Sequence, residues 1–424
     1  MERLLSRIPE ELRSLINKLR EQALAKDLKV YLVGGFVRDL ILGVKNLDLD
    51  IVVEGDGIKF ADDFIKLQSG KIIVHKHFGT ATVLSQSGLK IDFSSARKEI
   101  YPKPAHLPIV SPGSLKDDLF RRDFTINAMA INLSDGAIVD YFGGQDDLRN
   151  KKIRVLHDLS FRDDPTRILR GIRFEQRFNF SMESKTLKLL KEAVRLKMLE
   201  KVQPHRTRDD LILVLKEDNP LDNIIRIKEL LGFGFIYPKL RILAKNLAYL
   251  KSLEKEMKWF NENYPQRRGL DSWLIYLIGL VDSLSPLAIR KICDKFGLRK
   301  GEEKRILGPK QVTRKFIVDL SDPKIKPARI FALLNPLSYE TVIALRAKYT
   351  NSVLKRHIAD FLEIYNGMCI FVSGDDLHCL GLSPGPRYQE IFTLVLNAKL
   401  NGEVKSKEEE LYLIKKLLVQ KDRA

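Results

Sequence analysis

The chain has 424 residues, 44% of them hydrophobic and 30% charged, so it can form two to four domains, each with its own core. Its formal net charge of +18 suits a polyanionic partner, because basic side chains that neutralise phosphates release condensed counterions. The three cysteines have no metal-ligand spacing, the N-terminus is charged throughout, and no apolar run approaches the roughly 20 residues that span a bilayer. These features argue against a disulfide scaffold, a zinc site, a signal peptide and a membrane span, and we expect a cytoplasmic protein.

The first 145 residues are expected to form a small α/β domain. Apolar residues recur at helical spacing between Ile8 and Ala23, which predicts an opening amphipathic helix. Short β-like runs follow, separated by glycine-containing turns and interrupted by a helical stretch over 57–67. The β-like runs are 30–33, 50–53, 71–74, 81–84, 89–93 and 128–133. His75 and His77 alternate along one of them, and we expect a solvent-facing edge there rather than a metal site.

Beyond about residue 150, the pattern changes to helix after helix, with basic residues between the apolar ones. The clearest predicted helices are 165–177, 184–196, 208–215, 221–231, 270–280, 286–296, 328–334 and 388–398. No fixed-period repeat and no long low-complexity linker interrupts them. The sequence therefore predicts an α/β head followed by a long, basic, all-helical remainder.

Two carboxylates stand at the start of a predicted strand. Asp48 and Asp50 are two residues apart, so their side chains leave the same face. Such a pair repels itself unless cations lie between the two groups, and paired Mg²⁺ ions about 4 Å apart are the usual arrangement. Asp92, between the apolar Ile91 and Phe93, would complete the metal cage from a neighbouring strand. An Asp-x-Asp alone is weak, because surface turns produce it often; the third strand-borne Asp strengthens it.

A pair of glycines precedes these carboxylates. Gly34 and Gly35 lie between a predicted strand and an apparent helix that begins at Phe36. Glycines let a backbone approach a ligand, and a helix N-terminus offers unpaired N–H groups to phosphate. Arg38, one turn into the helix, could grip phosphate oxygens. The alternative is a tight strand-to-helix turn with a solvated arginine.

Taken together, these residues resemble the active-site signature of the class II tRNA nucleotidyltransferase and bacterial poly(A) polymerase family. Four further segments continue the resemblance in the family's order. They are IDFSSAR (91–97), RRDFTINA (121–128), DYFGGQDDL (140–148) and DDPTRILRGIR (163–173). The resemblance covers about residues 28–180 and is weaker near 205 and over 372–410.

The resemblance implies an α+β fold: a polymerase-β-like nucleotidyltransferase head followed by an all-helical neck, body and tail. The implied parts are an N-terminal helix (1–27), a catalytic head (28–145), a base-reading neck (146–200), a body (201–310) and a tRNA-binding tail (311–424). Asp48, Asp50 and Asp92 become the catalytic residues, and the first two become ligands of Mg²⁺. The implied nucleotide-binding residues are Gly34, Gly35, Arg38, Arg122, Asp164, Arg167, Arg170 and Arg173.

The family's base selection can be rebuilt from hydrogen-bonding groups. Cytosine and adenine each present an amino donor beside an unprotonated ring nitrogen, so a carboxylate accepts from the first and a guanidinium donates to the second. Uracil and guanine present the reverse pattern, which makes both contacts repulsive. Pro165 suits the first position of a helix, which predicts Asp164 as its N-cap and Arg167, Arg170 and Arg173 along one flank. The alternative is a simple cap followed by a solvated arginine stripe.

Several segments bear on the choice of nucleotide or on tRNA binding. Asp163 stands where family members that add both C and A commonly carry Glu. The stretch 97–113 contains four prolines and a glycine, which predicts a loop rather than a strand pair; a flexible loop here helps the family's switch toward adding A. The stretch 372–387 is expected to form a helix, a glycine-rich turn and a helix that could grip a tRNA phosphate, or only a tight corner. Basic runs at 255–268 and 299–305 could add phosphate contacts or be solvated faces.

The resemblance implies a Mg²⁺-dependent enzyme that builds or completes the 3′-terminal CCA of tRNA from CTP and ATP. It would hold the 3′ end and the acceptor/T arm of tRNA, with no membrane and no protein partner implied. The alternatives are an enzyme that adds only the final A, one that adds only CC, and a poly(A) polymerase. A protein of a different functional class, a catalytically inactive RNA-binding scaffold, is a further alternative. The intact set of Asp48, Asp50 and Asp92 argues against it.

Overall fold

The computed structural model describes residues 8–44, 48–67, 70–75, 79–85 and 88–421. The chain divides into two compact units, Met1–Phe235 and Ile236–Ala424. The border between them falls inside the range 201–310 that was expected to form one body, and the finer division into five parts stays a prediction. In the described ranges, every helix is too short or too polar to cross a membrane.

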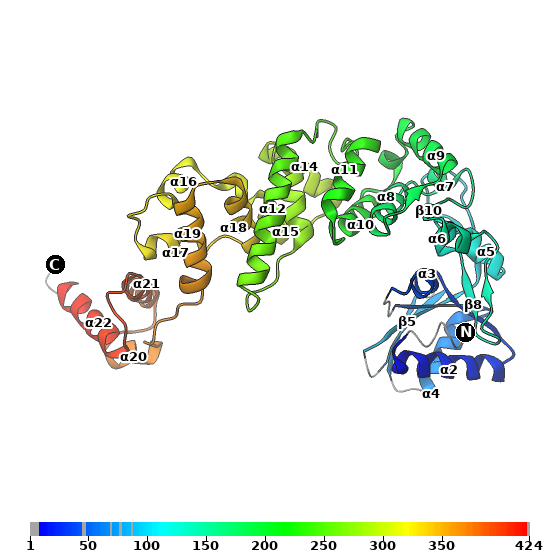
Figure 1. Cartoon of the computed structure of the whole chain (residues 1–424). Helices are drawn as coiled ribbons and strands as arrows, with labels where there is room; N and C mark the ends of the chain where they lie inside the picture. The colour runs from blue at the N-terminus through cyan, green and yellow to red at the C-terminus, as the bar shows by residue number, and fades with distance from the viewer. Residues whose placement is uncertain (1–7, 45–47, 68–69, 76–78, 86–87, 422–424) are drawn as a thin grey trace. The chain divides into compact units, whose positions relative to one another are not determined.

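The first unit begins with a seven-stranded sheet of order β3-β4-β5-β2-β1-β8-β9 (Figure 1). Its strands are β1 (Lys29–Val33), β2 (Leu49–Glu54), β3 (Gly70–His75), β4 (Thr80–Ser85), β5 (Lys90–Ser95), β8 (Ala130–Asn132) and β9 (Ile138–Val139). β2 and β5 run parallel and the other neighbours antiparallel. All six β-like runs of the sequence are therefore strands of this sheet. His75 is exposed on the edge strand β3, as predicted, and His77 lies outside the described residues.

Two helices cover one face of the sheet, α2 (Glu10–Ala25) and α4 (Gly57–Leu67) (Figure 1). Gln22 of α2 donates to the carbonyl of Phe60 in α4 at 3.0 Å. The Phe60 and Phe64 rings pack on Phe93 of β5, with centroids 6.1 and 6.0 Å away. Because side chains alternate along a strand, the packing of Phe93 on this face turns Asp92 to the opposite face.

The segment after β5 corrects one expectation. β6 (Arg97–Ile100) and β7 (Ile109–Pro112) pair antiparallel, so the prediction of a loop without a strand pair is wrong. Three of the four prolines lie in the connection between the strands. The fourth, Pro112, is the last residue of β7, where a ribbon of two edge strands tolerates a missing donor.

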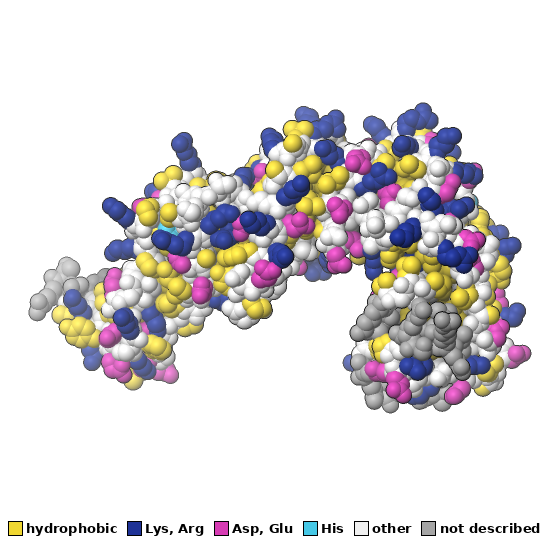
Figure 2. Space-filling view, in the orientation of Figure 1, with side chains coloured by type: hydrophobic (Ala, Val, Ile, Leu, Met, Phe, Trp, Pro, Cys, Tyr) yellow, Lys and Arg dark blue, Asp and Glu magenta, His cyan; other side chains and the backbone are white. Residues whose placement is uncertain are grey.

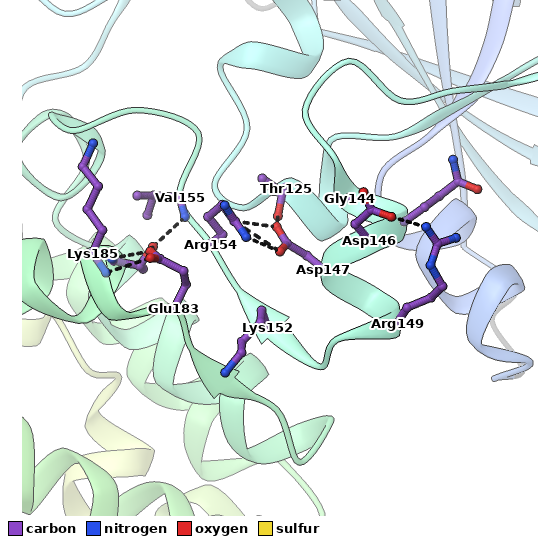
Figure 3. Close-up of polar contacts among 12 residues, drawn as sticks. Thr125, Gly144, Asp146, Asp147, Arg149, Lys152, Arg154, Val155, Glu183 and Lys185 are labelled. Carbon is purple, nitrogen blue, oxygen red and sulfur yellow. Dashed lines mark hydrogen bonds and ion pairs between the residues drawn. The ribbon is translucent and has the colours of Figure 1, made fainter.

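The rest of the first unit is helical apart from one short strand pair. Its elements are α3 (Gly35–Leu42), α5 (Leu115–Phe120), η2 (Thr125–Asn127), α6 (Gly144–Arg149), β10 (Lys152–Ile153), α7 (Ser160–Asp163), α8 (Arg167–Arg177), β11 (Ser181–Met182), α9 (Ser184–Arg195), η3 (Met198–Lys201), α10 (Pro204–Leu215) and α11 (Pro220–Leu230). Buried Asp147 of α6 accepts from Thr125 Oγ1 at 2.6 Å and from Arg154 Nη2 at 2.9 Å (Figure 3). This carboxylate ties the end of the head to the strand that leads into the helices.

The second unit is all-helical in its described part. Its elements are α12 (Ala244–Asn263), α13 (Ser272–Val281), α14 (Pro286–Phe296), α15 (Lys300–Gln311), α16 (Arg314–Leu320), α17 (Pro327–Leu334), α18 (Tyr339–Lys348), α19 (Ser352–Asp360), η4 (Phe361–Tyr365), α20 (Gly374–Cys379), α21 (Pro386–Leu400) and α22 (Lys407–Lys421). The predicted helix–turn–helix is present as α20 and α21. With the mixed sheet of the first unit, this confirms the predicted α+β class.

Some cations of the second unit serve its own packing. The carboxylate of Glu340 is fully buried and accepts from Arg268 Nη2 at 2.7 Å and from Arg305 Nη1 at 3.3 Å. These two arginines belong to the basic runs that the sequence left undecided, and here they neutralise a buried charge. Figure 2 shows many other Lys and Arg side chains on the visible surfaces of both units.

Candidate functional site

One cleft of about 930 Å³ in the first unit gathers most of the predicted site residues. Its lining includes Gly35, Arg38, Asp48, Asp50, Arg122, Asp164, Arg167, Arg170 and Arg173. Gly34 and Asp92 are the two predicted residues outside the lining. Strand β2 and the residue before it thus contribute Asp50 and Asp48 to the cleft, and α8 contributes Arg167, Arg170 and Arg173.

The carboxylates come together through strand register. Asp50 of β2 lies directly beside Asp92 of β5, and Asp48 stands two residues before Asp50. Burial raises the pKa of Asp50; the Arg122 charge opposes this, and the charges of Asp92 and Asp48 add to it. Among the described residues, no three His, Cys, Asp or Glu side chains converge as a metal-holding cluster. Asp92 is engaged by donors of the sheet: its Oδ1 accepts from Thr82 Oγ1 at 2.6 Å and its Oδ2 accepts from a lysine on its own strand.

Gly34 makes room for an arginine beside the carboxylates. Its φ is +71°, and a Cβ built there would lie 2.5 Å from Nη1 of Arg122 and 3.7 Å from Oδ2 of Asp50. Its N–H donates to the carbonyl of Met129 at 3.2 Å. Arg122 Nη2 in turn donates at 3.1 Å to Asp118, a fully buried carboxylate that the sequence did not identify. Gly34 therefore positions Arg122, and Gly35 and the first turn of α3 face the cleft.

Arg38 is buried, with most of its guanidinium already bonded. Nε and Nη2 donate to the two oxygens of Asp39 at 2.8 and 2.9 Å, and Nη1 donates to Asn127 Oδ1 at 2.5 Å. Its plane also lies over Phe178 and Phe174, 4.6 and 5.3 Å from the ring centroids. A guanidinium has five N–H groups, so two remain for a ligand in the cleft. Its role as a triphosphate contact stays a prediction.

The predicted base-reading residues lie at the start of α8, which begins later than expected. The helix starts at Arg167 with Thr166 as its N-cap, so the prediction of Asp164 as N-cap is wrong. Asp164 instead closes the preceding turn: its Oδ1 accepts from Thr166 N at 3.2 Å and Thr166 Oγ1 at 2.8 Å. Arg206 Nη2 reaches the same oxygen at 2.9 Å. These three contacts all go to Oδ1 of Asp164, a residue that lines the cleft.

Two hydrogen bonds to the protein fix the position of Arg167. Its Nη1 donates to Ser160 Oγ at 2.6 Å and its Nη2 to the carbonyl of Arg121 at 2.7 Å. The side chain is buried, so these two bonds fix the plane of the guanidinium. Asp163, the unusual acid of the motif, ends α7 outside the lining of the cleft. Burial raises its pKa, and the charges of Arg167 and Arg162 oppose this.

The next two arginines of α8 have acidic partners that the sequence did not reveal. Arg170 donates from Nε and Nη2 to Asp123 Oδ2 at 2.9 and 2.6 Å. Burial would raise the pKa of Asp123, but the charge of Arg170 and the Asn127 hydrogen bond outweigh it and hold that pKa well below its usual range. Arg173 donates to Glu217 at 3.2 Å. Because these partners lie more than forty residues away in the chain, no local pattern could have found them.

Comparison with known proteins agrees with this geometry. Residues 30–154 match the family described as the poly A polymerase head domain. The chain is 37% identical over 400 residues to an A-adding tRNA nucleotidyltransferase of Geobacter sulfurreducens, covering 92% of this chain and 45% of that relative. It is 33% identical to an A-adding tRNA nucleotidyltransferase of Halalkalibacterium halodurans, covering 94% of this chain and 90% of the relative.

Solved structures extend the likeness to the helical remainder. The Thermotoga maritima CCA-adding enzyme complexed with tRNA is similar with a TM-score of 0.74 at 33% identity, over 98% of this chain and 97% of that one. The chain spans less than half of the Geobacter relative but nearly all of the Halalkalibacterium and Thermotoga proteins. On identity and coverage together, the chain belongs to the tRNA nucleotidyltransferases, a family of enzymes.

Proposed function

We propose that this chain transfers nucleotides from CTP and ATP to the 3′ end of tRNA, building or completing the CCA terminus. The observation that carries the proposal is that one cleft holds the carboxylates Asp48 and Asp50 together with the Asp164–Arg167 pair. A carboxylate pair serves phosphoryl transfer, and the second pair matches the hydrogen-bonding edge that cytosine and adenine share. The tRNA nucleotidyltransferases that this chain resembles, and the tRNA bound to the Thermotoga enzyme, indicate the class of acceptor.

The chain's own side chains account for selection of the nucleotide. Oδ2 of Asp164 accepts from the amino group of the base, and Arg167, fixed by Ser160 and a backbone carbonyl, donates to the ring nitrogen. Arg122, held by Asp118 beside Asp50, donates to phosphate oxygens of the triphosphate. The first turn of α3 adds backbone N–H groups near Gly35. Binding in this way orients the α-phosphate toward the carboxylate face of the sheet.

The carboxylates fit a divalent cation, and we assign Mg²⁺ to them. Strand register places Asp50 beside Asp92 on the face that also carries Asp48, and the buried Asp50 lies among like charges that a cation would neutralise. Asp48 and Asp50 would be the ligands, with Asp92 next to them. When bound, Mg²⁺ lowers the pKa of the attacking 3′ hydroxyl and neutralises charge on the triphosphate.

A second candidate is an enzyme that adds only the terminal A. Two observations favour it: both relatives compared above are named A-adding, and Asp163 replaces the Glu common in enzymes that add C and A. The turn between α20 and α21 is a candidate contact to the body of the tRNA in either case. A cytoplasmic location suits both functions.

The test uses three tRNA transcripts, ending before CCA, after C and after CC. Each is offered to the purified chain with CTP alone, ATP alone or both, and the products are sized by sequencing gel. A CCA-building enzyme extends all three transcripts to CCA when both nucleotides are present. An A-adding enzyme adds one AMP to the transcript ending in CC and leaves CTP unused. No incorporation with any transcript, or long untemplated A tracts, would refute the proposal.

A further inference from the structure

Lys90 lies next to the three carboxylates Asp48, Asp50 and Asp92 on the sheet. The register of β2 and β5 pairs Asp50 with Asp92 and Leu49 with Ile91. Extended by one residue, the same register sets Asp48 beside Lys90. Since side chains alternate along both strands, Lys90 and the three aspartates leave the same face of the sheet. The site therefore consists of three carboxylates and one ammonium on adjacent strands.

The lysine is bonded to the carboxylate that is not part of the cleft lining. Lys90 Nζ lies 2.5 Å from Asp92 Oδ2, while Thr82 Oγ1 of β4 holds Asp92 Oδ1 at 2.6 Å. Both oxygens of Asp92 are thus engaged by donors of this chain. The Lys90 side chain is 52% exposed, so it can leave this position without disturbing the core.

We propose that Lys90 is the internal counter-ion of the metal site: it occupies Asp92 in the metal-free protein, and a divalent cation must displace it. The inference rests on the proposed function, because it takes these carboxylates to be the metal site. The ammonium relieves repulsion among the three aspartates while no cation is present. It also repels an incoming cation and keeps the neighbouring Asp92 engaged, so metal binding to the protein alone is weakened. The triphosphate then brings its own negative charge, and metal and nucleotide bind together.

The test is Mn²⁺ binding to the full chain by isothermal titration calorimetry, without nucleotide or tRNA. In Lys90→Gln the Kd for Mn²⁺ should fall about three- to tenfold, as expected for removing one cation near a divalent ion at a solvated site. Lys90→Arg keeps the charge and should bind Mn²⁺ like the parent chain. Lys71→Gln removes one exposed charge from the edge strand of the same sheet and should leave the Kd unchanged.

A second readout separates this role from simple packing. With EDTA, Lys90→Gln should melt at a lower temperature than the parent chain, because the aspartates then repel one another unscreened. With saturating Mn²⁺, the two Tm values should converge, whereas a packing role would keep the difference in both conditions. An unchanged or weaker Mn²⁺ affinity in Lys90→Gln, a Tm gap that persists with metal, or no Mn²⁺ binding by the parent chain would each overturn the proposal. If Lys90→Gln binds Mn²⁺ more tightly but the parent chain transfers no nucleotide to tRNA, the role of Lys90 as counter-ion would stand and only the proposed function would be rejected.

Discussion

Replacing Asp164 with Asn reverses the polarity of one atom in the Asp164–Arg167 pair that we propose reads the base. In the parent chain, Oδ1 accepts from the backbone N–H and hydroxyl of Thr166 and from Arg206. All three are donors, so the asparagine must place its carbonyl oxygen at that position. Its amino group then occupies the place of Oδ2, so in the proposed binding mode a donor replaces the acceptor that meets the amino group of the base.

The expected effect follows from one charge-assisted hydrogen bond. Such a bond is worth about 1.5–3 kcal/mol, so kcat/KM for ATP should fall about 10- to 150-fold. The new amino group matches the carbonyl of guanine or uracil, so use of GTP should rise while use of ATP falls. The ATP-to-GTP ratio of kcat/KM should therefore drop by about 10² or more.

The assay measures kcat/KM for ATP and GTP on a tRNA ending in CC, for the parent chain and Asp164→Asn. Asp163→Asn is the matched control, because that carboxylate lies next in the chain but outside the cleft lining. Its ATP-to-GTP ratio should stay near that of the parent. An equal loss for both nucleotides in Asp164→Asn, with the ratio unchanged, would show that Asp164 does not read the base.

Three further predictions concern stability and coupling. Gly34→Ala should lose about 1–3 kcal/mol of stability and most activity, because φ is +71° and the new Cβ would displace Arg122. The control Gly35→Ala should keep its stability. Equal melting temperatures of the two variants would refute the steric explanation. Burial, and after it the charge of Arg167, lowers the pKa of His157 to about 4. As the pH falls, His157 therefore takes up its proton at a higher pH in the unfolded chain than in the folded chain. The contribution of neutral His157 to the free energy of unfolding is complete above about pH 6.5 and is lost as the pH falls toward 4. In His157→Gln, the free energy of unfolding measured in urea should therefore fall by about 1–2 kcal/mol less over this pH range than in the parent chain. An unchanged pH dependence would contradict this prediction. Glu410→Ala leaves two backbone N–H groups and a lysine without their buried acceptor, so the second unit should lose about 2–4 kcal/mol while ATP binding to the first unit is kept; an unchanged unfolding midpoint would contradict it.

Local sequence patterns were sufficient where the structure follows local rules. Alternation predicted that Asp92 faces away from the core residue Phe93, and strand register then set it beside Asp50. The family resemblance carried by the ordered motifs named most of the residues that line the cleft. The prediction of Asp164 as N-cap failed because the first turn forms i→i−3 bonds, from Arg167 N to the Asp164 carbonyl and from Ile168 N to the Pro165 carbonyl, both at 3.1 Å, so the α-helix begins only at Arg167.

Other parts depend on contacts between distant segments. Counting prolines missed the strand pair after β5, because what matters is whether each proline's missing N–H falls on a paired position. The partners Asp123 and Glu217 become visible only when the head, its exit and α8 pack together, whereas Asp118 stands four residues before Arg122 and could have been found from that spacing. Lys90 was visible in the sequence as an ordinary surface lysine, and only the register gives it three acidic neighbours.

The most direct test of the account compares the parent chain with Asp48→Asn/Asp50→Asn. Single-turnover addition of AMP to a tRNA ending in CC is measured beside tRNA affinity by fluorescence anisotropy. We expect the double variant to lose at least about 10³-fold in rate, since it removes the proposed ligands of Mg²⁺, while the tRNA Kd changes less than about threefold. Incorporation by the double variant at a rate near that of the parent would contradict the assignment of the catalytic site.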